Sequence, residues 1–205
     1  MTFDIASMLK PEAFDHPVSD IELIETHISW VILTGKYAYK IKKPVDFGFL
    51  DFSTLDKRHD CCMQEVALNR RLAPAIYLDV VAITGTFEKP LISASGHAIE
   101  YAVKMIQFAQ SSQLDNMLAA GQLGLEHMDA IARMVADFHQ SIAVADNAME
   151  YGTTATVSQP VEENFVQINE HLDTSKYADT LTALSQWSSA EFITRQAVFE
   201  QRKAD

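Results

Sequence analysis

The sequence predicts an α+β protein with a strand-rich first half and a helical second half. Before Phe108, short β-prone segments alternate with turn residues, and a single helical segment interrupts them. After Phe108, apolar residues recur at every third or fourth position instead of alternating. With 205 residues and 48% hydrophobic content, the chain can bury a sizeable core in one large domain or two small ones.

Three short strands are expected near the N-terminus. The segments 21–27, 29–34 and 37–42 are rich in apolar, β-branched and aromatic residues, and Gly35-Lys36 separates the last two. Connections this short join antiparallel strands. We therefore expect an antiparallel meander over residues 21–42.

One helix and further strands complete the first half. Ser53 followed by Asp56 resembles a helix-start capping pattern, apolar residues then recur at helical spacing, and Pro74 marks the end. The segments 77–83, 91–93 and 97–106 have the composition of strands and are separated by glycine-containing turn signals. Residues 1–107 are therefore predicted to form an antiparallel sheet with one helix.

The second half, residues 108–205, is expected to contain only helices. Ser111-Ser112 can cap a short helix ending at Gly121, and a long apolar stripe covers 125–142. The polar segment 146–160 is typical of a turn-rich connection. Three more helices are expected over 161–172, 177–187 and 189–203.

Composition excludes several classes of partner. The chain carries 28 acidic and 16 basic residues, a net charge of −12, which argues against nucleic-acid and anionic-membrane surfaces. Residues 1–10 lack a basic start followed by an apolar run, and no stretch approaches a membrane span. Adjacent Cys61 and Cys62 suit packing in a helix rather than a disulfide framework. We expect a cytoplasmic protein.

A lysine in the third expected strand is the first candidate for chemistry. Strand alternation places Ala38 and Lys40 on one face and Tyr37 and Tyr39 on the other. A small residue can lie against a flat base such as adenine, while the lysine reaches the phosphates. A lone strand lysine is more often a solvated surface residue, so a functional role for Lys40 depends on the residues around it.

Glu65 on the following helix is the second candidate. It borders the apolar stripe of that helix, so its carboxylate needs a partner. Lys40 is the partner we expect, and this pairing would orient the ammonium for phosphate binding. Lys42 and Lys43 are alternative candidates for the phosphate-binding lysine. If Lys42 had this role, Lys40 would occupy the position beside the base, where a small residue is needed. We therefore expect Lys42 and Lys43 to stay exposed.

Several segments, in this order, resemble the aminoglycoside-phosphotransferase-like family, which has the protein-kinase-like fold. They are WVILTG at 30–35, YAYKIKKP at 37–44, VDFGFLDFS at 45–53, Glu65 with LNRRLAP at 68–74, and EYAVKM at 100–105. The resemblance covers nearly the whole chain and is weaker in the helices. It implies a nucleotide-holding N-lobe over 1–107 and part of an α-helical C-lobe over 108–205.

The resemblance also implies roles for single residues. Lys40 and Glu65 would position the phosphates, Ala38 would contact adenine, and Met105 would belong to the hinge. ATP and Mg²⁺ are the expected cofactors of a complete enzyme, with an unknown small-molecule acceptor. In similar bacterial proteins a P-loop nucleotide-binding domain often follows this region, whereas this chain contains no G-x-x-x-x-G-K-[ST] sequence.

Two short motifs look like catalytic signatures in the wrong places. Asp46-Phe47-Gly48 spells the metal-binding D-F-G but precedes Glu65, so we expect a turn there. His127-Met128-Asp129 spells the catalytic H-x-D but falls within the long helix. A second H-x-D, His171-Leu172-Asp173, has Ala178 where the Asn of the catalytic loop would stand. We therefore assign no catalytic and no metal-binding residues and expect the chain to end before the catalytic loop.

Three functional hypotheses follow. The first is the N-terminal part of an ATP-dependent phosphotransferase acting on a small-molecule hydroxyl, inactive as this chain. The second is a non-catalytic nucleotide-binding or regulatory module. The third, a helical interaction protein with an acidic second half, rests on charge alone. Uncovered helix faces around Phe192, Ile193 and Phe199 would also favour self-association.

Overall fold

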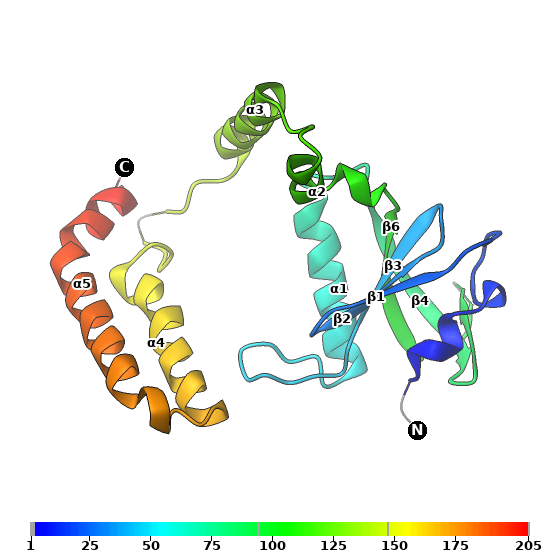
Figure 1. The fold of residues 1–205 in the computed structure, drawn as a ribbon, viewed down its shortest axis with the longest axis horizontal. Coiled ribbons are helices and arrows are strands. Elements are labelled where there is room, and N and C mark those ends of the chain that lie inside the picture. The colour runs from blue at the N-terminus through cyan, green and yellow to red at the C-terminus, as the bar shows by residue number, and fades with distance from the viewer. Residues whose placement is uncertain (1–2, 94, 147, 205) are drawn as a thin grey trace. The chain divides into compact units, whose positions relative to one another are not determined.

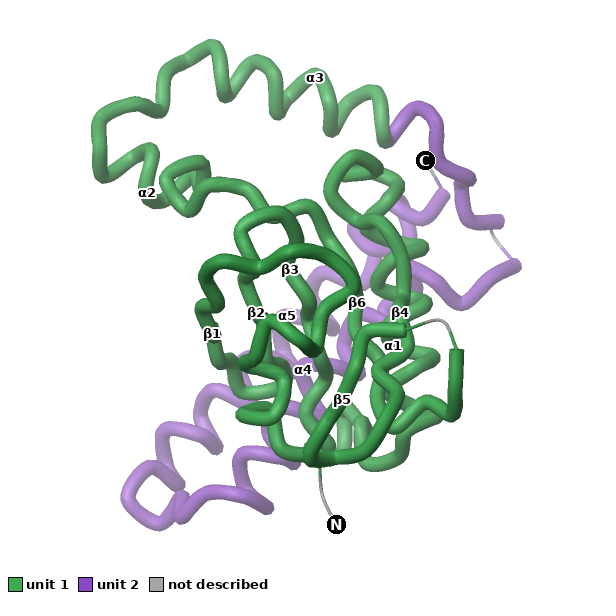
Figure 2. The backbone as a smooth tube through the Cα atoms, turned by 90° about the vertical axis from the view of Figure 1, so that its right-hand side faces the viewer, with its two compact units in different colours: residues 1–138 green, residues 139–205 purple. Residues whose placement is uncertain are grey.

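The protein has an α+β fold with one antiparallel sheet. The computed structural model describes residues 3–93, 95–146 and 148–204. These residues form two compact units, the first up to Phe138 and the second from His139 onward (Figure 2). The α+β class expected from the sequence is therefore confirmed.

The sheet contains six strands in the order β1-β2-β3-β6-β4-β5, and every neighbouring pair is antiparallel. The strands are β1 (Glu22–Glu25), β2 (Ser29–Leu33), β3 (Tyr37–Lys42), β4 (Tyr77–Thr86), β5 (Lys89–Ile92) and β6 (Glu100–Ile106). The expected N-terminal meander is present as β1, β2 and β3. The crossover that follows puts β6 next to β3, so residues distant in sequence share one surface.

The two faces of this sheet have different covers. On one face, Tyr39 and Ile41 of β3 are buried beneath the N-terminal segment, which contains the short 3₁₀ helices η1 (Ile5–Met8) and η2 (Pro11–Ala13). On the other face, helix α1 (Leu55–Asn69) packs against β4 and β6 (Figure 1). Ala38, Lys40 and Lys42 alternate with Tyr39 and Ile41 and so belong to the α1 face.

Helix α1 is fixed by its cap and by a small apolar cluster. The hydroxyl of Thr54 accepts a hydrogen bond from the Lys57 N–H, so Thr54 is the N-cap and the expected capping by Ser53 is wrong. Cys62, fully buried, packs with Val66 against Val103 of β6. Burial raises the pKa of the Cys62 thiol to about 12, which keeps it protonated.

The remaining elements are helical. They are η3 (Gln110–Ser112), α2 (Leu114–Ala119), α3 (Leu125–Ser141), α4 (Thr154–His171), η4 (Ser175–Tyr177) and α5 (Ala178–Ala204). No helix among the described residues is long and apolar enough to cross a membrane.

Two helix boundaries differ from expectation. Helix α4 begins well before Pro160 and contains it, because the Thr153 hydroxyl caps the first turn by accepting from the Thr156 N–H. Proline removes one helix hydrogen bond and its ring crowds the carbonyl four residues earlier, yet α4 continues through Pro160. The break expected between 187 and 189 is absent, and α5 runs through this region with the Ser189 hydroxyl bonded to the Ser185 carbonyl.

Candidate functional site

The carboxylate of Glu65 lies between two lysines of strand β3. Lys40 Nζ is 2.8 Å from Glu65 Oε1, and Lys42 Nζ donates to the other oxygen, Oε2. Glu65 is on the third turn of α1, the helix that covers this face of the sheet. We call Lys40, Lys42 and Glu65 the charged triad. The pairing of Lys40 with Glu65 that the sequence predicted is therefore present.

The expectation that Lys42 stays exposed is wrong. It is buried, with only 6% of its side chain exposed, against 28% for Lys40 and 11% for Glu65. Its ammonium also lies over the ring of Phe52, 5.3 Å from the centroid. Sequence reasoning missed this role because alternation gives the face of a residue but not which part of that face the helix covers. The same expectation is wrong for Lys43, whose side chain is only 15% exposed and pairs with Glu25 on β1 at 2.6 Å.

The charge state of Glu65 follows from its surroundings. Burial by itself raises the pKa of this carboxyl, but hydrogen bonds and positive charge from Lys40 and Lys42 outweigh burial and hold the pKa below its ordinary value. Glu65 is thus ionised at neutral pH. The triad then carries one net positive charge, which an anion can compensate.

An apolar cavity of about 290 Å³ opens on the same face of the sheet. Its walls include Val31, Leu33, Ala38 and Met105. Ala38 is opposite Met105 in the register of β3 and β6, and Val31 is opposite Lys40 in the register of β2 and β3. The structure therefore brings all four predicted site residues to one side of the sheet, with Ala38 and Met105 in the cavity and Lys40 beside it.

Tyr77 links the cavity to the triad. It lines the cavity from β4. Burial raises the pKa of its hydroxyl, and the negative charge of Glu65 raises this pKa further. A cavity with largely apolar walls and a charge at its edge is typical of sites for ligands that join an apolar ring to an anionic group.

Gln107 also lines this cavity and was not predicted from the sequence. Its side-chain oxygen accepts hydrogen bonds from the backbone N–H groups of Thr34 and Gly35, at 2.9 and 2.8 Å. These bonds tie the β2–β3 turn to the residue that follows β6. Met105 itself belongs to strand β6, and the connection to the helices begins at Gln107.

The two motifs set aside in the sequence have the structures expected of them. The Gly48 N–H donates to Asp46 Oδ1 at 2.9 Å, and Gly48 has a φ of 80°, so Asp46-Phe47-Gly48 forms a turn. His127 and Asp129 both lie in helix α3. Within the described residues, no three His, Cys, Asp or Glu side chains cluster closely enough to hold a metal ion.

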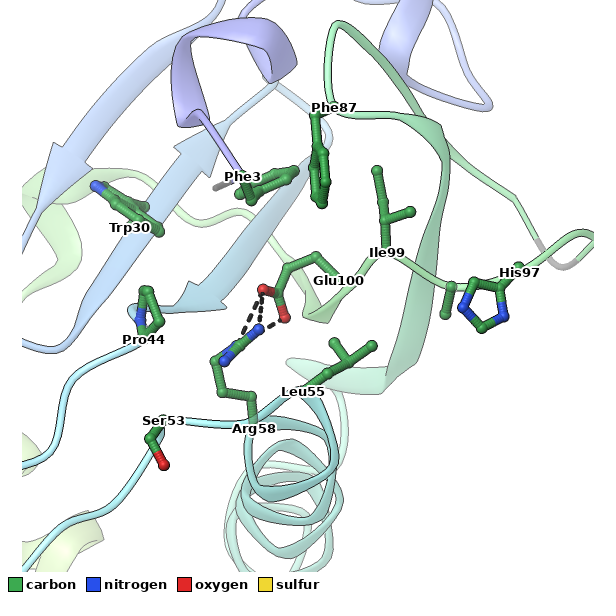
Figure 3. A pocket seen from close by; sticks show the side chains of 11 residues that line it. Phe3, Trp30, Pro44, Ser53, Leu55, Arg58, Phe87, His97, Ile99 and Glu100 are labelled. Carbon is green, nitrogen blue, oxygen red and sulfur yellow. Dashed lines mark hydrogen bonds and ion pairs between the residues drawn. The ribbon is translucent and has the colours of Figure 1, made fainter. Parts of the chain in front are cut away.

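A second cavity, of about 500 Å³, lies beside the start of α1 (Figure 3). Phe3, Trp30 and Phe87 are among its walls. Arg58 and Glu100 point toward each other across it, with Arg58 Nη2 2.8 Å from Glu100 Oε2 and Arg58 Nε 3.0 Å from both carboxylate oxygens. The charges of Arg58 and Glu100 neutralise each other, so the pair leaves no net charge to bind a ligand.

Comparisons with known proteins give relatives without an assigned function. The chain is 32% identical over 191 residues to uncharacterized proteins of Mycobacterium tuberculosis and Mycobacterium bovis. The alignment covers 91% of this chain but 36% of each relative, so the chain spans about a third of the length of the curated relatives it matches. No family profile and no solved structure matches the chain.

Proposed function

We propose that the chain binds ATP, as the nucleotide-holding part of a kinase-fold phosphotransferase that acts on a small-molecule hydroxyl. One observation carries this proposal. The Lys40–Glu65 ion pair lies beside an apolar cavity that contains Ala38 and Met105, all on one face of an antiparallel sheet. A nucleotide needs these two surfaces next to each other, because its base is apolar and flat and its phosphates are anionic.

The order of these residues along the chain supports the same proposal. A strand lysine held by a glutamate on the next helix is one of the parts by which kinase-like folds position ATP phosphates. The sheet order supports this reading, since β6 lies directly against β3. The proposal that the substrate is a small-molecule hydroxyl rests on the resemblance to the aminoglycoside-phosphotransferase-like family.

A non-catalytic nucleotide-binding module is the second candidate. It is favoured because His127 and Asp129 lie in a helix and Asp46-Phe47-Gly48 forms a turn, so neither motif provides a catalytic loop. No group of three His, Cys, Asp or Glu side chains among the described residues could hold a metal ion, so Mg²⁺ would be bound mainly through the phosphates of ATP. ATP hydrolysis or transfer by the 205-residue chain would contradict this second candidate.

The test is calorimetric titration of the chain with ATP. We expect binding, and at least about a tenfold loss of affinity in Lys40→Ala, because tenfold corresponds to about 1.4 kcal/mol and a charge-assisted bond to phosphate is of that order. Lys104→Ala is the matched control, since Lys104 is also a strand lysine but contacts Asp15 and Tyr37 on the other face. Equal affinity in wild type and Lys40→Ala would reject the assignment of Lys40.

The cavity has its own test. Ala38→Leu puts a bulky side chain where the base is proposed to lie, so we expect it to weaken both ATP and adenosine binding. Lys40→Ala should weaken ATP binding and leave adenosine binding nearly unchanged, because adenosine has no phosphate. If Ala38→Leu leaves adenosine binding intact, the base binds elsewhere.

A further inference from the structure

We propose that Lys42 is a positioning residue that stays bound to Glu65 and thereby allows Lys40 to leave this carboxylate for the anionic group of a ligand. The choice of ATP as the ligand rests on the proposed function. The division of roles between the two lysines rests on the charges and burial of the triad itself. Lys42 is not expected to contact the ligand.

Each lysine binds a different oxygen of the same carboxylate. Lys40 Nζ bonds to Oε1 and Lys42 Nζ to Oε2, so either ammonium can move without displacing the other. The two lysines are two positions apart on β3 and therefore share a face. One carboxylate cannot neutralise both, and one positive charge remains for a ligand.

Burial distinguishes the two lysines. Only 6% of the Lys42 side chain is exposed, and the ring of Phe52 lies beneath its ammonium. The Lys40 side chain is 28% exposed and is opposite Val31, a wall residue of the apolar cavity. The lysine that solvent and a ligand can reach is therefore Lys40, and Lys42 is the one held in place.

The physical reason is the cost of a buried charge without a partner. If Lys40 were the sole partner of Glu65, moving its ammonium to a phosphate would leave a carboxylate that is 11% exposed without compensation. Lys42 removes this cost because its bond to Oε2 persists. The ammonium of Lys40 then needs only a small displacement, not a new counter-charge, to bind an anion.

The other titratable groups around Glu65 do not replace Lys42. Burial raises the pKa values of Cys62 on α1 and Tyr77 on β4, so both are neutral at pH 7. Glu100 on β6 is paired with Arg58. Lys40 and Lys42 are thus the cations that hold Glu65 ionised.

The first experiment needs no nucleotide. The ¹³C signal of the Glu65 carboxyl is titrated in wild type, Lys40→Met and Lys42→Met, two variants that remove the same ammonium from the same strand. We expect the proton affinity of Glu65 to rise in both variants and to rise at least about tenfold further in Lys42→Met, because the buried partner is screened less by water. An equal or larger rise in Lys40→Met would overturn the proposal.

The second experiment measures ATP affinity by calorimetry at pH 7.5 and 5.5. We expect Lys42→Met to bind about tenfold more weakly than wild type at pH 7.5, because Lys40 is then retained by Glu65. The ratio of the two affinities should shrink at pH 5.5, where protonation of Glu65 in the variant releases Lys40. The titration of the phosphates is common to both proteins and cancels in the ratio. A loss independent of pH would indicate a merely structural role and contradict the proposal.

Two further variants distinguish the loss of the Lys42 charge from a loss of folding. Lys42→Arg retains the charge and should restore most of the affinity. Lys42→Gln, which can still hydrogen-bond to Glu65, is the neutral variant to use if Lys42→Met does not fold. If wild type itself binds no ATP, the nucleotide proposal is wrong, while the carboxyl titration still decides whether Lys42 or Lys40 is the main partner of Glu65.

Discussion

Two charged residues of helix α1, Arg58 and Glu65, form ion pairs with the sheet, and the two sites are built in different ways. Near its start, Arg58 meets Glu100 of β6 with one cation per carboxylate, and Glu100 is 2% exposed. Two turns later, Glu65 meets two lysines of β3, one of which is partly exposed. The first arrangement is closed and neutral, whereas the second carries a spare positive charge beside an apolar cavity.

This difference indicates what each pair is for. In this neutral buried pair each guanidinium nitrogen of Arg58 has a partner, with Nη1 bonded to the Phe52 carbonyl, so the pair fixes α1 against β6 and offers nothing to a ligand. An unbalanced pair costs some stability but leaves an anion-binding charge. The Arg58 pair should therefore matter for folding, and the charged triad should matter for both folding and binding.

The largest expected effect is the loss of stability in Arg58→Met. Removing the guanidinium leaves Glu100 buried without a counter-charge, which costs about 3–5 kcal/mol. Urea unfolding at pH 7 measures it. The double variant Arg58→Met/Glu100→Met should recover much of this loss, because no unpaired charge remains. A cost below about 1 kcal/mol for the single variant would show that the two pairs do not differ as the structure indicates.

Glu65→Gln should have an intermediate effect that depends on pH. Losing two charge-assisted hydrogen bonds is expected to cost about 1–3 kcal/mol at pH 7. The pKa of Glu65 is lowered in the folded protein, so its contribution is present above the unfolded pKa of about 4.3 and is lost as the pH falls through the folded value. The difference between wild type and variant should therefore vanish in acid.

Urea unfolding of both proteins between pH 7 and pH 3 tests this. The matched control is Glu22→Gln, because Glu22 is an exposed strand residue of the same type. Its difference from wild type should be close to zero at every pH. A Glu65→Gln difference that stays constant down to pH 3 would mean that the carboxylate charge does not stabilise the fold.

The smallest expected effect is that of Ser29→Ala. Ser29 is opposite Lys42 in the β2–β3 register and fully buried, and its hydroxyl has no hydrogen-bond partner within the described residues. Removing an unpartnered hydroxyl should change stability by less than about 1 kcal/mol, with either sign.

Thr34→Val is the control for Ser29→Ala, measured in the same urea unfolding experiment. Thr34 is also buried, but its hydroxyl donates to the Tyr37 carbonyl at 2.8 Å, so its loss should cost about 1 kcal/mol. A larger loss in Ser29→Ala than in Thr34→Val would mean that the Ser29 hydroxyl is hydrogen-bonded in the folded protein. A further hydrogen-bonding group would then lie next to the Ser29 hydroxyl, near the charged triad.

Some parts of the site could be predicted because they are local. Residue alternation placed Ala38 and Lys40 on one face of a strand, and helical spacing placed Glu65 beside an apolar stripe. The ends of the elements were predicted less well. Thr54 rather than Ser53 caps α1, and α4 continues through Pro160, because capping bonds and packing outweigh single-residue preferences.

The sequence by itself determined the α+β class, the meander, the helix bearing Glu65 and the partner it would find in Lys40, since all of these depend on short-range periodicity. Only the tertiary structure decided that Lys42 is buried, because its burial requires α1 and Phe52 to pack over the end of β3. The same holds for Arg58 and Glu100, which are 42 positions apart, and for Gln107, which reaches back to the turn after β2. Contacts between distant segments depend on how the elements are placed against one another, and no local pattern encodes that placement.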